Sequence, residues 1–253
     1  MKPNHRLLGE RIVLTGTSIT KKAQSKIEAL GGQAIHLPLI EVAEIQSMED
    51  QQLLHQSQNM DWLIFTSQNA VHAFANKLQK YRFSADQWCS KIAAVGSKTA
   101  QSLEELGFSI DFMPTTFSAD CMVIEFNEIL HNSDQCMFMK GSMAKDTLKD
   151  GLHCQLAIWT IYETVVCTKY LEEMRELLSK EKCTVVFASP SAVDTFAQYI
   201  LPSINWNTLQ VAAIGHITEA KLSEYGAVNI IQPSVYTMES VIDEIAIRKE
   251  LEQ

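Results

Sequence analysis

Residues 61–74 read DWLIFTSQNAVHAF, and residues 184–196 repeat their pattern as TVVFASPSAVDTF. In each stretch a short apolar run ends in a turn that contains serine, and an amphipathic stretch follows. Phe65 and Phe187 hold the same place in the two copies, at an offset of 187 − 65 = 122. A β-branched or aromatic run of this length predicts a buried strand, and the stretch after it predicts a helix.

A second repeated stretch lies downstream in each copy. Val95-Gly96-Ser97-Lys98-Thr99 recurs as Ile214-Gly215-His216-Ile217-Thr218, at an offset of 214 − 95 = 119. The same offset carries Gly107 to Gly226. Matches of residue type and order over roughly 60 residues per copy indicate two domains of similar structure.

Apolar runs alternate with amphipathic stretches along the whole chain. Repeated strand and helix units predict parallel sheets with helices on both faces, so we expect an α/β fold of two similar domains. The same alternation disfavours all-α and all-β folds. The predicted strands are RIVLT (11–15), WLIFT (62–66), IAAVG (92–96), MFMK (137–140), TVVFA (184–188) and VAAIG (211–215).

Two extended, β-prone segments are predicted to link the domains: 38–45 (PLIEVAEI) and 160–166 (TIYETVV). One domain would then comprise residues 46–159, and the other would combine 1–37 with 167–253. The chain would cross twice between the domains through a two-stranded linker. Two contiguous domains are the alternative that the sequence leaves open.

Composition and motifs disfavour several classes of protein. The net charge is −9 without a run of Lys or Arg, which disfavours a nucleic-acid binder. No apolar run approaches the roughly 20 residues of a membrane span, and MKPNHRLLGE lacks the apolar core of a signal peptide, so we expect a cytoplasmic protein. The six cysteines form no C-x-x-C pair and mostly lie in apolar runs, which predicts buried free thiols and no metal site.

Every predicted strand ends in a small turn rich in hydroxyl groups. In open parallel sheets, ligands bind at the carboxyl ends of the strands, where helix N-termini offer free N–H groups to anions. The turns would therefore line a cleft between the domains that suits a ligand with several carboxylates. Helix capping alone would explain the same residues. The turns are Thr15-Gly16-Thr17-Ser18, Thr66-Ser67-Gln68-Asn69, Gly96-Ser97-Lys98-Thr99, Lys140-Gly141-Ser142, Ser189-Pro190-Ser191 and Gly215-His216-Ile217-Thr218.

Motifs of the common enzyme classes are missing from the sequence. It contains no P-loop, no G-x-G-x-x-G after the first strand, no G-x-S-x-G elbow and no H-E-x-x-H. His216 is the histidine that falls at a predicted strand-to-helix turn, which makes it a candidate ligand contact. The protein is therefore either a binding protein or an enzyme whose chemistry needs few dedicated side chains.

Taken in order, these residues resemble the uroporphyrinogen-III synthase family. Residues 65–71 match its pattern FTS-x-N-x-V, 95–99 match VG-x-x-T, and the second half repeats both; TIYET (160–164) is similar to the family's linker segment with a tyrosine. The resemblance covers nearly the whole chain. It implies two α/β domains joined by a two-stranded linker and a reaction on hydroxymethylbilane without metal or cofactor. We also expect a monomer.

The resemblance also implies a reaction. Loss of water from the terminal hydroxymethyl group gives an azafulvene, which ring D attacks through its substituted α-carbon to form a spiro intermediate. Fragmentation and recombination then leave ring D inverted in uroporphyrinogen III. Because the bilane cyclises unaided to the wrong isomer, the enzyme would mainly fold the substrate into one geometry. Tyr162 matches the linker tyrosine, which is the implied proton donor to the departing hydroxyl, although a phenol is a weak general acid.

Residue by residue, the resemblance implies substrate contacts at Ser67, Ser189, Thr99 and Thr218. The turns add further candidates, namely Thr15, Asn69, Ser97, Lys98, Lys140, Gly141, Ser142, Ser191 and His216. Two turns depart from the family. Thr15-Gly16-Thr17 stands where many members have Thr-Arg-Pro, and Lys140-Gly141-Ser142 stands where many have an arginine. Lysine keeps the charge but loses bidentate recognition of carboxylates.

Two other functions compete with cyclisation. The first is a two-domain binding protein that closes on a small anionic ligand without chemistry. The second is an enzyme with paired Rossmann-like domains similar to glycosyltransferases, which the lack of a nucleotide-binding turn disfavours. Tyr162 favours the cyclase, because a pure binding protein has no use for a phenol in its linker.

Overall fold

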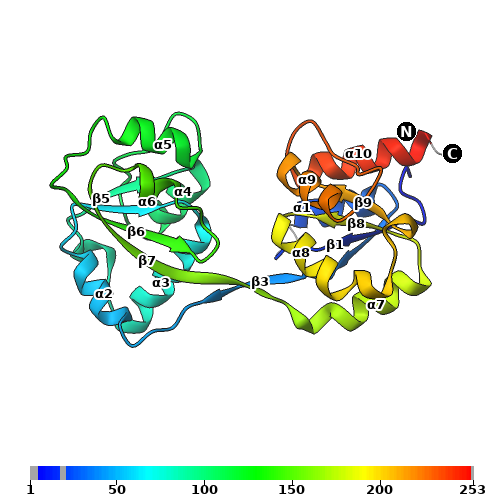
Figure 1. Cartoon of the computed structure of the whole chain (residues 1–253), viewed down its shortest axis with the longest axis horizontal. Coiled ribbons are helices and arrows are strands. Elements are labelled where there is room, and N and C mark those ends of the chain that lie inside the picture. Colours follow the sequence, from blue (N-terminus) through cyan, green and yellow to red (C-terminus); the bar gives the residue numbers. More distant parts are fainter. Residues whose placement is uncertain (1–4, 18–20, 252–253) are drawn as a thin grey trace. The chain divides into compact units, whose positions relative to one another are not determined.

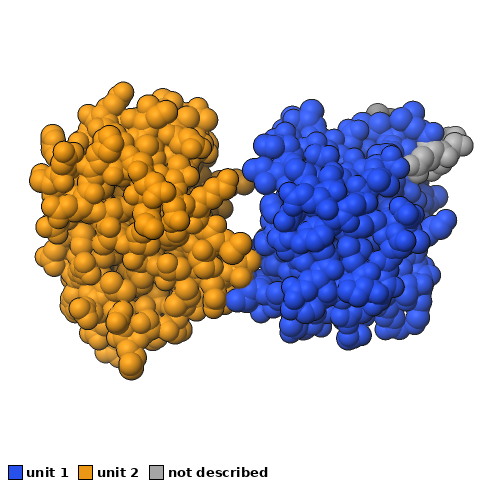
Figure 2. All heavy atoms as spheres, viewed as in Figure 1, with its two compact units in different colours: residues 1–41, 165–253 blue, residues 42–164 orange. Residues whose placement is uncertain are grey.

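The structure, a computed structural model, describes residues 5–17 and 21–251. The chain forms two compact units, residues 1–41 with 165–253 (unit 1) and residues 42–164 (unit 2), as Figure 2 shows. Each unit is a mainly parallel sheet with helices on both faces (Figure 1). The expected α/β fold of two similar domains is therefore confirmed.

Unit 1 contains a four-stranded parallel sheet in the order β2-β1-β8-β9. Alternate residues of β8 point to opposite faces, as they must in a strand. Val185 and Phe187 pack in one core with Met174 and Phe196, whereas Val186 packs in the other core. The strands are β1 (Arg11–Leu14), β2 (Gln33–His36), β8 (Cys183–Phe187) and β9 (Gln210–Ala213); the helices are α1 (Lys21–Ala29), α7 (Leu171–Lys180), α8 (Pro190–Tyr199), α9 (His216–Glu224) and α10 (Met238–Leu251).

Unit 2 contains a five-stranded sheet in the order β3-β7-β6-β4-β5, and β5, β4, β6 and β7 are parallel. Its two cores again use alternate residues of one strand, with Leu63 and Phe65 on one face and Trp62 and Ile64 on the other. The strands are β3 (Ile40–Glu44), β4 (Trp62–Phe65), β5 (Lys91–Ala94), β6 (Gln135–Gly141) and β7 (Gln155–Val166); the helices are α2 (Asp50–Ser57), α3 (Gln68–Tyr81), α4 (Ser97–Glu105), α5 (Ala119–Phe126) and α6 (Thr147–Gly151).

The chain passes between the units in two extended segments, β3 and β7. The Ile45 N–H donates to the Ile161 carbonyl at 3.0 Å, and the Cys167 N–H donates to the Leu39 carbonyl at 2.9 Å. The earlier residue of one segment pairs with the later residue of the other, so the two segments are antiparallel. Among the described residues, no helix is long and apolar enough to cross a membrane.

The internal repeat of the sequence is a repeat of structure. Phe65 lies opposite Ala94 in one sheet, and Phe187 lies opposite Ala213 in the other. The order β7-β6-β4-β5 in unit 2 corresponds to β2-β1-β8-β9 in unit 1. The two units therefore contain the same arrangement of four strands. In unit 1, β1 and β2 precede unit 2 in the sequence, and β8 and β9 follow it.

All six predicted strands are present, each within two residues of its predicted bounds. The cysteines follow their prediction less closely. All six are free; Cys136, Cys167 and Cys183 are buried, Cys121 and Cys154 are half-buried, and Cys89 is exposed. Burial raises the pKa of the Cys183 thiol. The expectation of buried thiols is thus wrong for Cys89, which lies outside the apolar strands.

Candidate functional site

The candidate site in unit 2 is the edge of the sheet where its parallel strands end. The carboxyl ends of parallel strands meet at one edge, and here they are followed by the predicted turns. Ser67 follows β4, Gly96 follows β5, and Gly141 and Ser142 lie at the end of β6. Tyr162 lies on β7 opposite Gly141.

Tyr162 and Ser67 form the central contact of this edge. The Tyr162 hydroxyl lies 3.1 Å from the Ser67 hydroxyl, and either group can be the donor. Ser67 is also the N-cap of α3, where its Oγ accepts the Ala70 N–H at 3.2 Å. When Ser67 donates to Tyr162, the phenolic proton is free to be given to a bound molecule. Tyr162 is half-buried.

Because Gly141 has no side chain, the Tyr162 ring can lie directly against its backbone. A Cβ at residue 141 would lie 2.4 Å from Cζ of Tyr162 and 2.7 Å from its hydroxyl oxygen, far inside contact distance. The register between β6 and β7 shifts at this point, because Lys140 pairs with Thr160 and Gly141 pairs with Tyr162. Such bulges re-aim side chains and are frequent beside active sites. The Ser142 N–H then donates to the Tyr162 carbonyl at 2.9 Å and fixes the turn to β7.

Two lysines and two helix N-termini lie at this edge. The buried Lys140 ammonium lies 3.6 Å from the more exposed carboxylate of Asp146. Lys98 and Ser97 are exposed at the start of α4, and Asn69 is exposed at the start of α3. The N-cap of α4 is Gly96, which has no side chain to bond the first N–H groups of the helix. These groups can receive an anion.

The matching edge of unit 1 holds the remaining predicted residues. Ser189 caps α8 by accepting the Ala192 N–H at 3.4 Å, and its hydroxyl lies 3.1 Å from that of Ser191. His216 is exposed at the start of α9, whose N-cap is Gly215. Unit 1 thus offers hydroxyl groups and a helix N-terminus without a side-chain cap, but its serine cap has another serine as its partner.

Three predicted threonines are buried. Thr15 has no exposed surface, and its hydroxyl donates to the Val186 carbonyl at 2.9 Å. The sequence predicts Thr15 both as the last residue of a strand and as the first residue of a turn. In the structure it directly follows β1, and its hydroxyl bonds the neighbouring strand. We therefore leave Thr15 out of the binding surface proposed below; Ser18 of the same turn lies outside the described residues. Thr99 and Thr218 are each 5% exposed, which suits a role in shaping their turns.

The sequence interpretation missed two aromatic residues at these edges. The Phe117 side chain packs at Gly96, and the Tyr236 side chain packs at Gly215. A signal was available, because 236 − 117 = 119 is also the offset that relates the two glycine turns. Pro114 and Pro233, three residues before each aromatic, are related by the same offset.

The amino ends of the same strands in unit 2 border a cavity of about 360 Å³, lined by Trp62, Lys91 and Asp134 among others. It lies at the opposite edge of the sheet from Tyr162, and none of the predicted residues lines it. Within residues 5–17 and 21–251, no three or more His, Cys, Asp or Glu residues are grouped to hold a metal ion.

Fold and site together define a protein of two similar α/β units with strand-end turns suited to an anionic ligand and one phenol held beside a serine. The chain belongs to the uroporphyrinogen-III synthase family, since the model of the family described as "Uroporphyrinogen-III synthase HemD" matches residues 21–243. That family is a family of enzymes of tetrapyrrole biosynthesis.

Named relatives agree with this assignment. The chain is 27% identical to a putative uroporphyrinogen-III synthase of Methanocaldococcus jannaschii over 75% of this chain and 80% of that protein. It is 24% identical to the uroporphyrinogen-III synthase of Synechococcus elongatus over 93% of this chain and 94% of that protein. Solved structures share the fold at lower identity. The Helicobacter pylori uroporphyrinogen-III synthetase superposes with a TM-score of 0.67 at 19% identity, covering 94% of this chain and 99% of that one. A mutant Thermus thermophilus uroporphyrinogen III synthase gives 0.65 at 13%, covering 97% and 100%.

Proposed function

We propose that this protein is a uroporphyrinogen-III synthase, a lyase that closes hydroxymethylbilane with loss of water and inversion of ring D. Membership of the family supports the reaction. The observation that carries it in this chain is the Tyr162 phenol, which is packed against Gly141 and hydrogen-bonded to Ser67 at 3.1 Å. These two contacts hold the Tyr162 hydroxyl in one orientation.

In this proposal Tyr162 gives its proton to the departing hydroxyl of the substrate. Ser67 donates to the phenolic oxygen, which stabilises the negative charge that develops there as the proton leaves. The backbone contact between Ser142 and Tyr162 keeps the ring beside β6. A phenol is a weak acid, so most of the acceleration comes from holding the bilane in the geometry in which ring D attacks.

The substrate carboxylates are proposed to bind at the strand-end turns of both units. In unit 2 the donors are the N-terminus of α4 and the side chains of Asn69, Ser97, Lys98, Lys140 and Ser142. In unit 1 they are the N-terminus of α9 and the side chains of Ser189, Ser191 and His216. Thr99 and Thr218 shape the two turns. Helix N-termini, lysine and hydroxyl groups all favour carboxylates over neutral groups.

We further propose that catalysis needs no metal or cofactor, and that the protein acts as a cytoplasmic monomer. The proposed acid, its serine partner and the glycine beneath it all lie in one unit of one chain, which supports a monomer. The segments 38–45 and 160–166 are proposed as the linker of the functional domains, 1–37 with 167–253 and 46–159. The antiparallel contacts of β3 and β7 support a two-stranded connection.

The proposal is tested by adding the protein to freshly prepared hydroxymethylbilane and separating the type I and type III products by chromatography. We expect predominantly type III product, above the control without enzyme. Tyr162→Phe removes the proton but keeps the ring, and we expect kcat to fall about 10-fold, since one weak acid contributes less than the usual general acid.

Tyr81→Phe, at the far end of α3 in the same unit, is the matched control and should keep wild-type kcat. A type I to type III ratio equal to that of the enzyme-free reaction would rule out the synthase and leave a binding protein on the same fold. Wild-type turnover in Tyr162→Phe would remove only the role of the acid.

A further inference from the structure

Two exposed aromatic side chains hold equivalent places at the strand ends of the two units. A Cβ at Gly96 would lie 3.7 Å from Cβ and Cγ of Phe117, and a Cβ at Gly215 would lie 3.4 Å from Cγ of Tyr236. Each aromatic residue thus packs against the glycine that precedes a helix, α4 in unit 2 and α9 in unit 1. The offsets 215 − 96 and 236 − 117 are both 119.

The loops that carry the two rings have the same backbone hydrogen bonds. The Ala94 N–H donates to the Phe112 carbonyl at 3.0 Å, and the Ala213 N–H donates to the Ile231 carbonyl at 2.9 Å. Further along, Ser118 N–H donates to Thr116 O at 2.7 Å, as Thr237 N–H donates to Val235 O at 2.8 Å. The rings are therefore held by a defined loop, and they are held in the same way twice.

Both rings pack at a glycine and remain partly open to solvent. Phe117 is 56% exposed and Tyr236 is 53% exposed. Each ring also lies beside a helix N-terminus whose first N–H groups have no side-chain cap. At both edges the flat face of an aromatic ring therefore lies next to a helix N-terminus, which favours anions.

We propose that Phe117 and Tyr236 each pack against a pyrrole ring of the linear tetrapyrrole, while the N-termini of α4 and α9 bind the carboxylates that the same ring carries. This inference rests on the proposed function and adds the residues that bind the rings. A carboxylate-bearing pyrrole is flat, rich in π electrons and anionic at its rim, which matches a ring beside free N–H groups. His216, whose ring centroid lies 5.5 Å from that of Tyr236, extends this surface in unit 1.

Kinetics with hydroxymethylbilane test the inference through the replacements Phe117→Leu and Tyr236→Leu. Leucine keeps an apolar side chain but removes the π surface, so KM should rise about 2- to 12-fold in each variant, as expected for one aromatic pair, and kcat should change less. Phe117→Tyr and Tyr236→Phe keep the ring and should stay within about 2-fold of the wild-type KM. Tyr225→Leu, an exposed tyrosine at the other end of α9, is the matched control.

The outcomes separate the inference from the proposed function. A wild type that converts hydroxymethylbilane no faster than the enzyme-free control would overturn the function, and this inference with it. An active wild type with unchanged KM in both leucine variants would overturn the inference alone. The inference is supported if the leucine variants lose affinity, the variants that keep the ring do not, and urea denaturation shows the same free energy of unfolding in all of them.

Discussion

Ser67 in unit 2 and Ser189 in unit 1 end equivalent strands and cap equivalent helices, yet they have different partners. Ser67 bonds the Tyr162 hydroxyl at 3.1 Å, whereas Ser189 bonds the Ser191 hydroxyl at the same distance. Both also accept the backbone N–H three residues ahead. The capping role is therefore common to the two copies, and the phenol is added to one of them.

The two units differ in the strand that lies beside their two central strands, β6 and β4 in unit 2 and β1 and β8 in unit 1. In unit 2 that strand is β7, which continues to Val166 and carries Tyr162 past the end of β6. In unit 1 the corresponding strand is β2, which ends at His36. The His36 ring donates from Nε2 to the Gly16 carbonyl at 2.8 Å, so its polar group is used by the backbone. The longer strand brings a phenol to the Ser67 hydroxyl in unit 2, and β2 brings no such group to Ser189 in unit 1.

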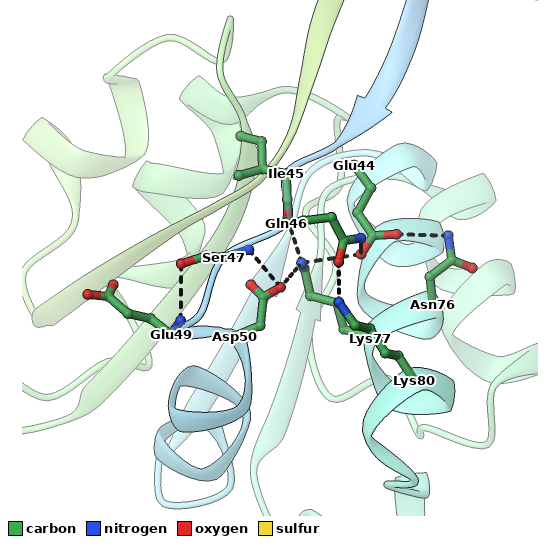
Figure 3. A network of polar contacts seen from close by, with 9 residues as sticks. All are labelled: Glu44, Ile45, Gln46, Ser47, Glu49, Asp50, Asn76, Lys77 and Lys80. Atoms are coloured by element: carbon green, nitrogen blue, oxygen red, sulfur yellow. Dashed lines mark hydrogen bonds and ion pairs between the residues drawn. The ribbon is translucent and has the colours of Figure 1, made fainter.

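A buried lysine also distinguishes the two copies (Figure 3). Lys77 on α3 has no exposed surface, and its ammonium lies 2.6 Å from Asp50 and 3.2 Å from Glu44 and donates to the Ile45 carbonyl at 2.6 Å. At the equivalent place, 77 + 122 = 199, unit 1 has the half-buried Tyr199. The lysine holds the segment that follows β3 against α3, whereas in unit 1 the Tyr199 carbonyl accepts hydrogen bonds from Arg175 of α7.

The largest expected effect is that of Lys77→Met on the stability of unit 2. Removal of the ammonium leaves the Asp50 carboxylate, which is 1% exposed, as a buried charge without its counterion. We expect the free energy of unfolding to fall by about 3–5 kcal/mol, as when one partner of a buried pair is removed. Urea denaturation measures this loss, and Tyr199→Phe in unit 1 is the control, which should lose less than about 1 kcal/mol.

A loss below about 1 kcal/mol for Lys77→Met would contradict the importance of the pair. Adding Asp50→Asn to Lys77→Met should recover part of the loss, since the unpaired charge is then gone. Without such recovery, the packing of the lysine stem rather than its charge would account for the effect.

Gly141→Ala tests whether the close contact between residue 141 and the Tyr162 ring requires glycine. The new methyl group overlaps the Tyr162 ring at 2.4 Å, so either the ring or β6 must move, and we expect the free energy of unfolding to fall by about 1–3 kcal/mol. Turnover should fall as well, because the hydroxyl leaves Ser67. Gly215→Ala in unit 1 is the control for stability, since its methyl group would meet Tyr236 at an ordinary 3.4 Å.

A double-mutant cycle identifies the cause. When Tyr162→Ala has already removed the ring, Gly141→Ala should cost little further stability. An equal cost with and without the ring would mean that residue 141 needs glycine for a reason other than the phenol.

The sequence was sufficient for the fold because each strand is a short apolar run and the runs occur in matched copies. It also pointed to the strand ends, since hydroxyl residues follow each run. It does not tell which hydroxyls face a neighbouring strand, as that of Thr15 does. The burial of Lys77 could not be predicted either, because a lysine on a helix of mixed polarity is usually solvated. It is buried where segment 44–50 packs on α3.

The phenol shows the same limit at the site. Tyr162 was found through its resemblance to a family pattern, but its contact with Ser67 joins residues 95 positions apart. That contact depends on the register shift between β6 and β7, which no local pattern indicates. Pairing across strands is a non-local property, so turns and caps could be predicted but the partner of each cap could not.

The smallest expected difference comes from Ser67→Ala and Ser189→Ala, which remove equivalent caps from the two units. Each should lower the free energy of unfolding by about 1 kcal/mol, the usual value of an N-cap, in urea denaturation. Turnover should separate them. Ser67→Ala also removes the partner of the Tyr162 hydroxyl, so kcat should fall toward that of Tyr162→Phe, and the two changes together should cost little more than either alone. Ser189→Ala should instead act mainly on KM, because its hydroxyl has no contact with the proposed acid. Equal kcat values for the two serine variants would show that the phenol does not depend on Ser67, and that the two copies differ in sequence but not in role.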